Sequence, residues 1–381
     1  MKKFLAMALA LLMVAVLLPV TAMAAEVTTA EALQDAVSNG GEVTLGADIT
    51  ASITIPEDKT VTLNLGGFTL TGNGNHTITN KGTLTVIGSG NVVNNDGGKG
   101  ALFNAVGATA YLNGGTFTGN TWYVIKNFGT MTIDGAEVTQ NHATSSAIAN
   151  GWYADPDGGI PYPTDGSTAN LTIIDGTFNG GMNTVKNDDY GVLEISGGTF
   201  SNTNGPTVLN WNVATISGGE FTVNSSATSV IANGSYNNEA DKGQLTITNG
   251  QFTSGDNGSG NLLGYGVGGQ DGGSVTISGG KFTGIMAAEG YPYMPVISGG
   301  TFSDQENAKK YLDNDNLVVN PATGKVEPRT IVIIVPDNDN TTTTTTEKPA
   351  NPATGANDFV GVAAALAVVS LLGMAVASRK K

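Results

Sequence analysis

The chain has 381 residues, including 54 glycines and no cysteine, and only 13% of its residues are charged. Without cysteine it can form no disulfide, which excludes a disulfide-stabilised scaffold. Its 17 basic and 32 acidic residues give a formal net charge of −15, the wrong sign for a protein that neutralises phosphates. We therefore expect no nucleic-acid partner.

The first segment, residues 1–24, is typical of a secretory signal peptide. Two lysines at positions 2 and 3 precede a long apolar stretch, which ends in a small-x-small triplet at 22–24. We expect the chain to be exported and the mature protein to begin near Ala25.

Residues 25–41 carry a helical pattern. Thr28 stands three residues before Glu31, which is the spacing of a capping box, and Gly40 follows as a stop signal. The pattern predicts a helix from Ala30 to Ser38. An uncovered end of a repeat structure exposes sheet edges, so we expect this helix to cap the first repeat.

Residues 42–304 repeat a short motif, written ISGGTFS at both Ile195 and Ile297. Most copies are spaced by 20 to 22 residues, and longer steps contain an insertion. The last apolar residue of the copies forms one column: Phe117, Val138, Phe178, Phe200, Phe221, Phe252, Phe282 and Phe302.

A second column shows the same period independently. It consists of Asn80, Asn104, Asn127, Asn150, Asn187, Asn210 and Asn233. The steps are 23 or 24 residues, except for one step of 37 that contains 14 extra residues within Gly151 to Thr168.

Each unit contains short alternating strands separated by Gly or Asn, and no helical pattern. Such strands can pair with their copies one unit away, at about 4.8 Å per coil. The sequence therefore predicts an all-β fold, a right-handed parallel β-helix of about ten coils. We expect the apolar column to point inward, the Gly-Gly corners to adopt positive φ, and the Asn amides to form a ladder.

Beyond the coils, residues 305–335 are expected to form a C-terminal cap with a helix from Glu306 to Leu312 and two strands. Residues 336–350, with six consecutive threonines, are expected to form a disordered stalk. Residues 351–381 hold an apolar stretch, Phe359 to Ala377, followed by a basic tail, as in a membrane anchor.

Shortly before that stretch stands NPATG, residues 351–355, and this motif resembles the LPxTG sorting signals of Gram-positive surface proteins. The resemblance implies that a sortase cleaves between Thr and Gly and joins the chain to peptidoglycan in the cell wall. A second NPATG, at 320–324, has no apolar stretch behind it. The motif residues are Asn351, Pro352, Ala353, Thr354 and Gly355.

The SGGxF corners resemble those of the pectin-lyase-like β-helix superfamily and of repeat surface proteins of gut Firmicutes. This fold carries lyases, hydrolases and non-enzymatic adhesins, so the resemblance does not decide the activity. A lyase needs a base, and Lys126 and Lys186 are the plausible ones, although we interpret both as solvated. A hydrolase needs two carboxyl groups, for which Asp188 and Asp189 are candidates, the alternative being an acidic surface loop.

Two further groups of residues are candidate binding sites. Asp155, Asp157 and Asp165 offer oxygen ligands for Ca²⁺ on a glycine-containing loop. Aromatic residues leave the asparagine corner on successive coils and are candidates for binding sugar rings, the alternative being that they pack under the inserted loop. These aromatic residues are Phe128, Trp152, Tyr153, Tyr190 and Trp211.

The sequence thus favours a cell-wall-anchored surface protein that binds carbohydrate or a host or neighbouring cell surface without catalysis. A polysaccharide-degrading enzyme and a structural spacer are the alternatives.

Overall fold

The computed structural model describes residues 25–234, 243–255, 258, 260–265, 273–287, 295–334 and 344–347. The expected signal peptide, sorting signal and apolar C-terminal stretch lie outside these residues. The chain divides into two units: Met1–Asn314 with Val319–Glu327, and Asp315–Val318 with Pro328–Lys381. The first unit contains the repeats.

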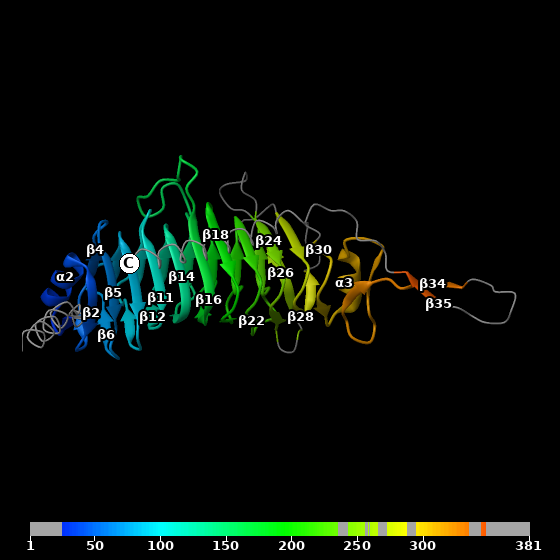
Figure 1. The fold of residues 1–381 in the computed structure, drawn as a ribbon, viewed down its shortest axis with the longest axis horizontal. Coiled ribbons are helices and arrows are strands. Elements are labelled where there is room, and N and C mark those ends of the chain that lie inside the picture. Colours follow the sequence, from blue (N-terminus) through cyan, green and yellow to red (C-terminus); the bar gives the residue numbers. More distant parts are fainter. Residues whose placement is uncertain are drawn as a thin grey trace, which may run out of the picture. The chain divides into compact units, whose positions relative to one another are not determined.

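The first unit is a parallel β-helix whose strands form two long sheets (Figure 1). Among the described residues, the larger sheet has 21 strands: β1 (Ala25–Val27), β2 (Gly41–Leu45), β3 (Ile49–Thr50), β5 (Thr60–Asn64), β6 (Thr69–Thr71), β8 (Thr83–Ile87), β9 (Asn91–Val93), β11 (Thr109–Asn113), β12 (Thr116–Gly119), β14 (Thr130–Gln140), β16 (Ala169–Gly180), β18 (Gly191–Ile195), β19 (Thr199–Asn202), β21 (Val213–Ile216), β22 (Glu220–Val223), β24 (Gln244–Ile247), β25 (Gln251–Ser254), β27 (Ser274–Ile277), β28 (Lys281–Thr283), β30 (Val296–Ile297) and β31 (Thr301–Phe302).

The smaller sheet contributes one strand per coil, and its ten described strands agree with the expected number of coils. They are β4 (Ile53–Ile55), β7 (Ile78–Asn80), β10 (Leu102–Asn104), β13 (Ile125–Asn127), β15 (Ile148–Asn150), β17 (Val185–Asn187), β20 (Val208–Asn210), β23 (Ile231–Asn233), β26 (Asn261–Tyr265) and β29 (Ile285–Ala287).

The apolar column lies in register in the larger sheet and points into the core, as predicted. Phe178 pairs with Phe200 and Phe200 with Phe221 on successive coils. From Phe178 to Phe302 the rings stack with centroids 4.6 to 4.8 Å apart. The stack is buried. One ring per coil therefore fills this part of the core at the spacing of the strands.

The predicted asparagine ladder is also confirmed. Each amide nitrogen from Asn80 to Asn210 donates to the amide oxygen on the next coil, at 2.7 to 2.8 Å. All seven asparagines of the column are fully buried. The ladder satisfies polar groups that would otherwise be costly to bury, and it fixes the register of the coils.

The second glycine of the ISGG corners adopts the positive φ expected of it. In Gly219, for example, φ is +99°, and an added Cβ would lie 3.1 Å from the ring of Phe221. A side chain there would be strained and would press on the phenylalanine stack.

The N-terminal helix, α2 (Ala30–Asn39), forms as predicted, and it packs against β2 and β4. Its cap differs from the expected one, because Thr29 rather than Thr28 accepts the hydrogen bond, from the Ala32 amide at 3.2 Å. Leu33 and Val37 are its buried residues, so the helix covers the first coil with an apolar face.

At the other end, α3 (Gln305–Ala308) continues into a 3₁₀ turn at Lys309–Tyr311, close to the predicted helix. Strands β32 (Leu317–Val319) and β33 (Val326–Pro328) follow. Between them, the NPATG copy at 320–324 is a folded turn. The Gly324 amide donates to the Asn320 carbonyl, and the Asn320 amide donates to the Lys325 carbonyl, both at 2.8 Å.

In the second unit, β34 (Ile331–Ile334) pairs antiparallel with β35 (Thr344–Glu347). The strand β35 falls within the segment that we expected to be a disordered stalk. Threonine is β-branched and favours extended backbone, so its pairing with an isoleucine-rich strand has a physical reason. None of the helices in the described residues has the length and apolar character needed to cross a membrane.

Candidate functional site

After β15 the chain leaves the β-helix as a loop, residues 151–168, which contains the 14 extra residues of the long step and is drawn in green above the strands in Figure 1. Beside it, the middle residues of the smaller sheet's strands form a column in register: Phe103, Lys126, Ala149, Lys186, Leu209 and Ala232. Because strand residues alternate, and their neighbours such as Ile125 and Asn127 belong to the core, this column faces outward. The loop nevertheless shields part of it from water.

Two lysines of the shielded part of the column meet three aspartates from outside it. Together they form a cluster of five charged residues: Lys126, Lys186, Asp157, Asp188 and Asp189. Lys126 is 0% exposed and Lys186 is 5% exposed, so our interpretation of both lysines as solvated is wrong. Asp188 and Asp189 are fully buried as well, which contradicts the acidic surface loop. The inserted loop, rather than the local sequence, removes these side chains from solvent.

Within this lysine–aspartate cluster, Lys126 lies between two carboxylates. Its Nζ donates to Asp157 Oδ2 at 2.6 Å and lies 3.6 Å from Asp188 Oδ2. Lys186 Nζ lies 2.6 Å from Asp188 Oδ1. Both contacts to Asp188 are close ion pairs between buried groups. Buried charges need such partners, because desolvation alone would be costly.

Aromatic rings surround both ammonium groups. Lys126 Nζ lies 4.6 Å from the ring centre of Phe128 and 5.0 Å from that of Tyr123. Lys186 Nζ lies 4.1 Å from the ring centre of Tyr153 and 4.0 Å from that of Trp211. These distances allow cation–π attraction, and the rings also keep water away from the ion pairs.

Burial shifts the acid–base equilibria of this region. Desolvation lowers the pKa of Lys186, and the nearby Asp188 carboxylate opposes that shift. Burial, together with the charges of Asp188 and Asp157, raises the pKa of Tyr123. Burial also raises the pKa of Tyr162, whose hydroxyl donates to Asp189 Oδ2 at 2.6 Å. Both tyrosines therefore stay neutral hydrogen-bond donors at physiological pH.

The five aromatic residues chosen from the sequence do lie along one edge. Phe128 packs on Trp152 and Trp152 on Tyr190, with ring centres 5.0 and 6.1 Å apart, while Tyr153 stacks on Trp211. Phe128, Trp152 and Trp211 are buried, Tyr190 is half-buried, and Tyr153 is 39% exposed. Ile160 and Tyr162 of the loop pack against the buried group that contains Phe128 and Trp152. The loop thus covers part of the aromatic edge, and Tyr153 is its most accessible ring.

The candidate calcium ligands serve other partners. Asp155 Oδ1 accepts from the Tyr162 amide, and Asp165 Oδ1 accepts from the Ser167 amide, both at 3.0 Å. Asp157 Oδ2 binds Lys126 and the Tyr153 amide. Within the part of the chain that the structure describes, there is no group of three His, Cys, Asp or Glu side chains arranged to hold a metal ion.

Next to the lysine–aspartate cluster is a cavity of about 330 Å³, which we call the loop pocket. The sequence analysis missed it, because its walls come from segments on three coils. Its lining includes Trp122, Tyr123, Tyr153, Ser146, Asn183 and Lys186. Trp122 is held by His76, whose ring centre is 4.9 Å away, and burial lowers the pKa of His76 to about 4.

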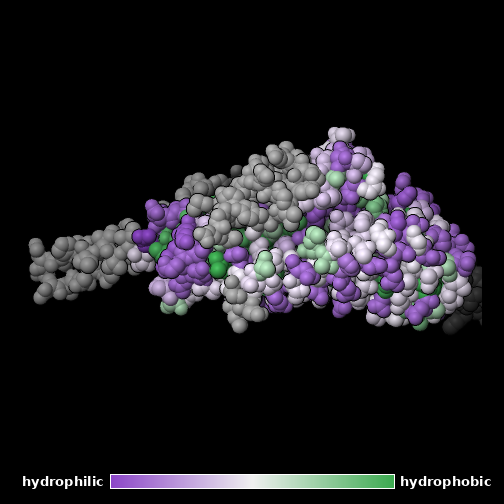
Figure 2. All heavy atoms as spheres, turned by 180° about the vertical axis from the view of Figure 1, so that it is seen from behind, coloured by the Kyte–Doolittle hydropathy of each residue, from purple (hydrophilic) through white to green (hydrophobic). Residues whose placement is uncertain are grey.

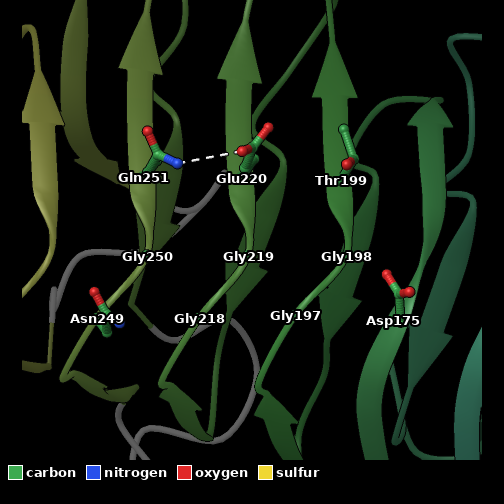
Figure 3. A pocket seen from close by; sticks show the side chains of 10 residues that line it. All are labelled: Asp175, Gly197, Gly198, Thr199, Gly218, Gly219, Glu220, Asn249, Gly250 and Gln251. Carbon is green, nitrogen blue, oxygen red and sulfur yellow. Dashed lines mark hydrogen bonds between the residues drawn. The ribbon is translucent and has the colours of Figure 1, made fainter.

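A second hollow of about 380 Å³, the glycine groove, runs across the ISGG corners (Figure 3). Glycines 197, 198, 218, 219 and 250 form its floor, and Asp175, Thr199, Asn249 and the Glu220–Gln251 pair stand around it. It exists because the corners lack side chains. With no aromatic residue in its lining, it offers a ligand less apolar surface than the loop pocket does.

Surface chemistry also singles out the loop pocket. Figure 2 shows one face, on which hydrophilic residues predominate and hydrophobic residues occur singly. Of the seven large hydrophobic residues exposed in the described part of the chain, two, Tyr153 and Met182, line this pocket. Exposed aromatic and apolar groups beside polar ones are typical of ligand sites.

Fold and site together define a class: a parallel β-helix with an inserted loop that forms an aromatic, polar pocket over a buried ion-pair cluster. Comparisons of the chain with protein-family models, curated proteins and solved structures gave no match.

Proposed function

We propose that the protein is exported, anchored by a sortase to the Gram-positive cell wall, and binds a carbohydrate through the loop pocket of a pectin-lyase-like β-helix. The observation that carries the binding proposal is the pocket itself. Trp122, Tyr123 and Tyr153 provide ring surface, and Ser146 and Asn183 provide hydrogen-bonding groups. Sugars present flat C–H faces and hydroxyl groups, which match such a lining.

The charge balance favours an uncharged sugar. The whole chain carries a formal net charge of −15, which repels polyanionic glycans. The positive charge of Lys186 at the pocket is already paired with Asp188. The pocket volume of about 330 Å³ lies at the lower end of small-molecule sites, so we expect it to hold a short part of a glycan.

Glycan-array binding by the full chain tests this function. We expect retention of at least one neutral glycan, with Tyr153→Ala weakening its binding about tenfold through loss of ring contact. Tyr111→Ala is the matched control, because Tyr111 is 41% exposed on β11 and does not line the pocket. Equal binding by wild type, Tyr153→Ala and Trp122→Ala would refute the pocket assignment, and no retention at all would favour a structural spacer.

A polysaccharide-degrading enzyme remains the second candidate, and one observation favours it. Lys186 lines the pocket, and burial lowers its pKa, as a general base requires. Asp188 and Asp189, the acids considered from the sequence, pair instead with lysines and with Tyr162. Sustained release of reducing ends or unsaturated uronates, abolished in Lys186→Met, would establish this candidate in place of simple binding.

Anchoring has its own test, because the chain contains two NPATG copies. In Gram-positive cells that contain sortases, we expect the protein released from the cell wall to have Thr354 as its last residue. We also expect the Thr354→Ala variant to be absent from the cell-wall fraction. Thr323→Ala should anchor normally, since the copy at 320–324 is folded into a hydrogen-bonded turn. Mass spectrometry of the C-terminal peptide identifies the cleaved bond. Cleavage after Thr323, or wall attachment that persists in Thr354→Ala, would contradict this assignment.

A further inference from the structure

We propose that Lys126 and Asp157 become joined by an amide bond between their side chains, which fastens the inserted loop covalently to the β-helix. The inference does not depend on carbohydrate binding. It starts from the contact between Lys126 Nζ and Asp157 Oδ2, which measures 2.6 Å. At that distance the nitrogen lies roughly 3.5 Å from the carboxyl carbon, close to the separation of reacting atoms in a near-attack geometry.

The surroundings favour condensation over a lasting ion pair. Lys126 is 0% exposed, and the Asp157 side chain is 12% exposed. Before the bond forms, one proton passes from the Lys126 ammonium group to the Asp157 carboxylate, which gives the amine and the carboxylic acid that condense. The rings of Phe128 and Tyr123, next to Lys126 Nζ, exclude the water that would reverse the reaction.

A second carboxylate is placed to move the proton. Asp188 Oδ2 lies 3.6 Å from Lys126 Nζ, and its other oxygen contacts Lys186. As the amine nitrogen attacks the Asp157 carboxyl carbon, Asp188 takes one proton from the nitrogen. It then gives that proton to the departing hydroxyl group. A C–N bond forms, a C–O bond breaks, and one water molecule leaves, so no oxidant, reductant or further reactant is needed.

The chain contains a built-in comparison. Lys309 Nζ and Glu306 Oε1 are also 2.6 Å apart, but their side chains are 43% and 83% exposed. If distance alone were sufficient, this pair would condense too. Because water solvates both groups and stabilises their charges, we expect it to remain an ion pair. The exposed pair therefore tests whether a short distance alone is sufficient for condensation.

Peptide mapping of the denatured full chain with a protease that cuts after glutamate tests the proposal. Glutamates at 57, 137 and 194 place Lys126 in peptide 58–137 and Asp157 in peptide 138–194. We expect these two peptides to run as one species, lighter than their sum by one water molecule. Peptides 290–306 and 307–327, which contain Glu306 and Lys309, should appear separately at full mass.

Variants assign the roles. Lys126→Met and Asp157→Ala should yield unlinked peptides. Asp188→Asn should also leave them unlinked while circular dichroism remains that of the folded protein, and this separates proton transfer from folding. Unlinked peptides in the folded wild-type protein would overturn the proposal. A water loss confined to peptide 138–194 would overturn the pairing as well, because it would point to Lys186 with Asp188 or to dehydration at Asp157.

Discussion

Replacing Asn150 by alanine is expected to lower the free energy of unfolding by about 4 kcal/mol, since several buried polar groups lose their partner at once. The Asn150 amide nitrogen donates to Asn187 Oδ1 at 2.8 Å and to the carbonyls of Ala169 and Val192 at 3.1 Å. Its amide oxygen accepts from Asn127 at 2.7 Å. Alanine can form none of these side-chain hydrogen bonds, and the site is too deeply buried for water to form them instead.

Guanidinium unfolding measures this effect, followed by the fluorescence of tryptophans such as Trp152, two residues from the substitution. Asn179→Ala is the matched control, because Asn179 is an exposed asparagine on β16 and should change stability by less than about 0.5 kcal/mol. If both variants unfolded at the same denaturant concentration, the ladder would not be a major source of stability.

Replacing Phe221 by alanine is expected to cost about 3 to 5 kcal/mol, because it opens a cavity in the ring stack. Phe221 is 1% exposed and lies between Phe200 and Phe252, at ring-centre distances of 4.6 and 4.8 Å. Phe221→Leu keeps part of the volume and should cost less than half as much.

Thermal unfolding of the two Phe221 variants beside wild type gives the order of stability. Tyr111→Ala removes a ring of similar size from the exposed face of β11 and should leave the unfolding temperature almost unchanged. An equal loss for Tyr111→Ala and Phe221→Ala would mean that the core stack contributes no more than surface contacts.

The coil period, the inward phenylalanines, the asparagine ladder and the N-terminal helix were all predictable from the residues. A parallel β-helix pairs each residue with its copy one coil away, so structural columns appear directly as sequence spacing. Even the insertion was visible, as the single step of 37 residues. The first helix cap was misassigned by one residue, because Thr28 and Thr29 are adjacent and only backbone geometry chooses between them.

The candidate site was predicted less well, and Lys126 and Lys186 show why. Their positions in the strands correctly place them on the outer face, where a lysine is ordinarily solvated. Asp157 and Tyr153, however, reach them from a loop whose path has no repeat to reveal it. The loop pocket escaped prediction for the same reason, since Trp122, Ser146 and Asn183 meet only when three coils stack.

The sequence by itself determined the winding of this protein: where each coil turns, which side chains stack, and where one coil is interrupted. Only the tertiary structure decided that the interruption folds back over the outer face, buries two lysines among carboxylates and rings, and leaves a pocket beside them. The physical reason is that stacking repeats a local pattern, whereas covering a face brings together residues that share no period.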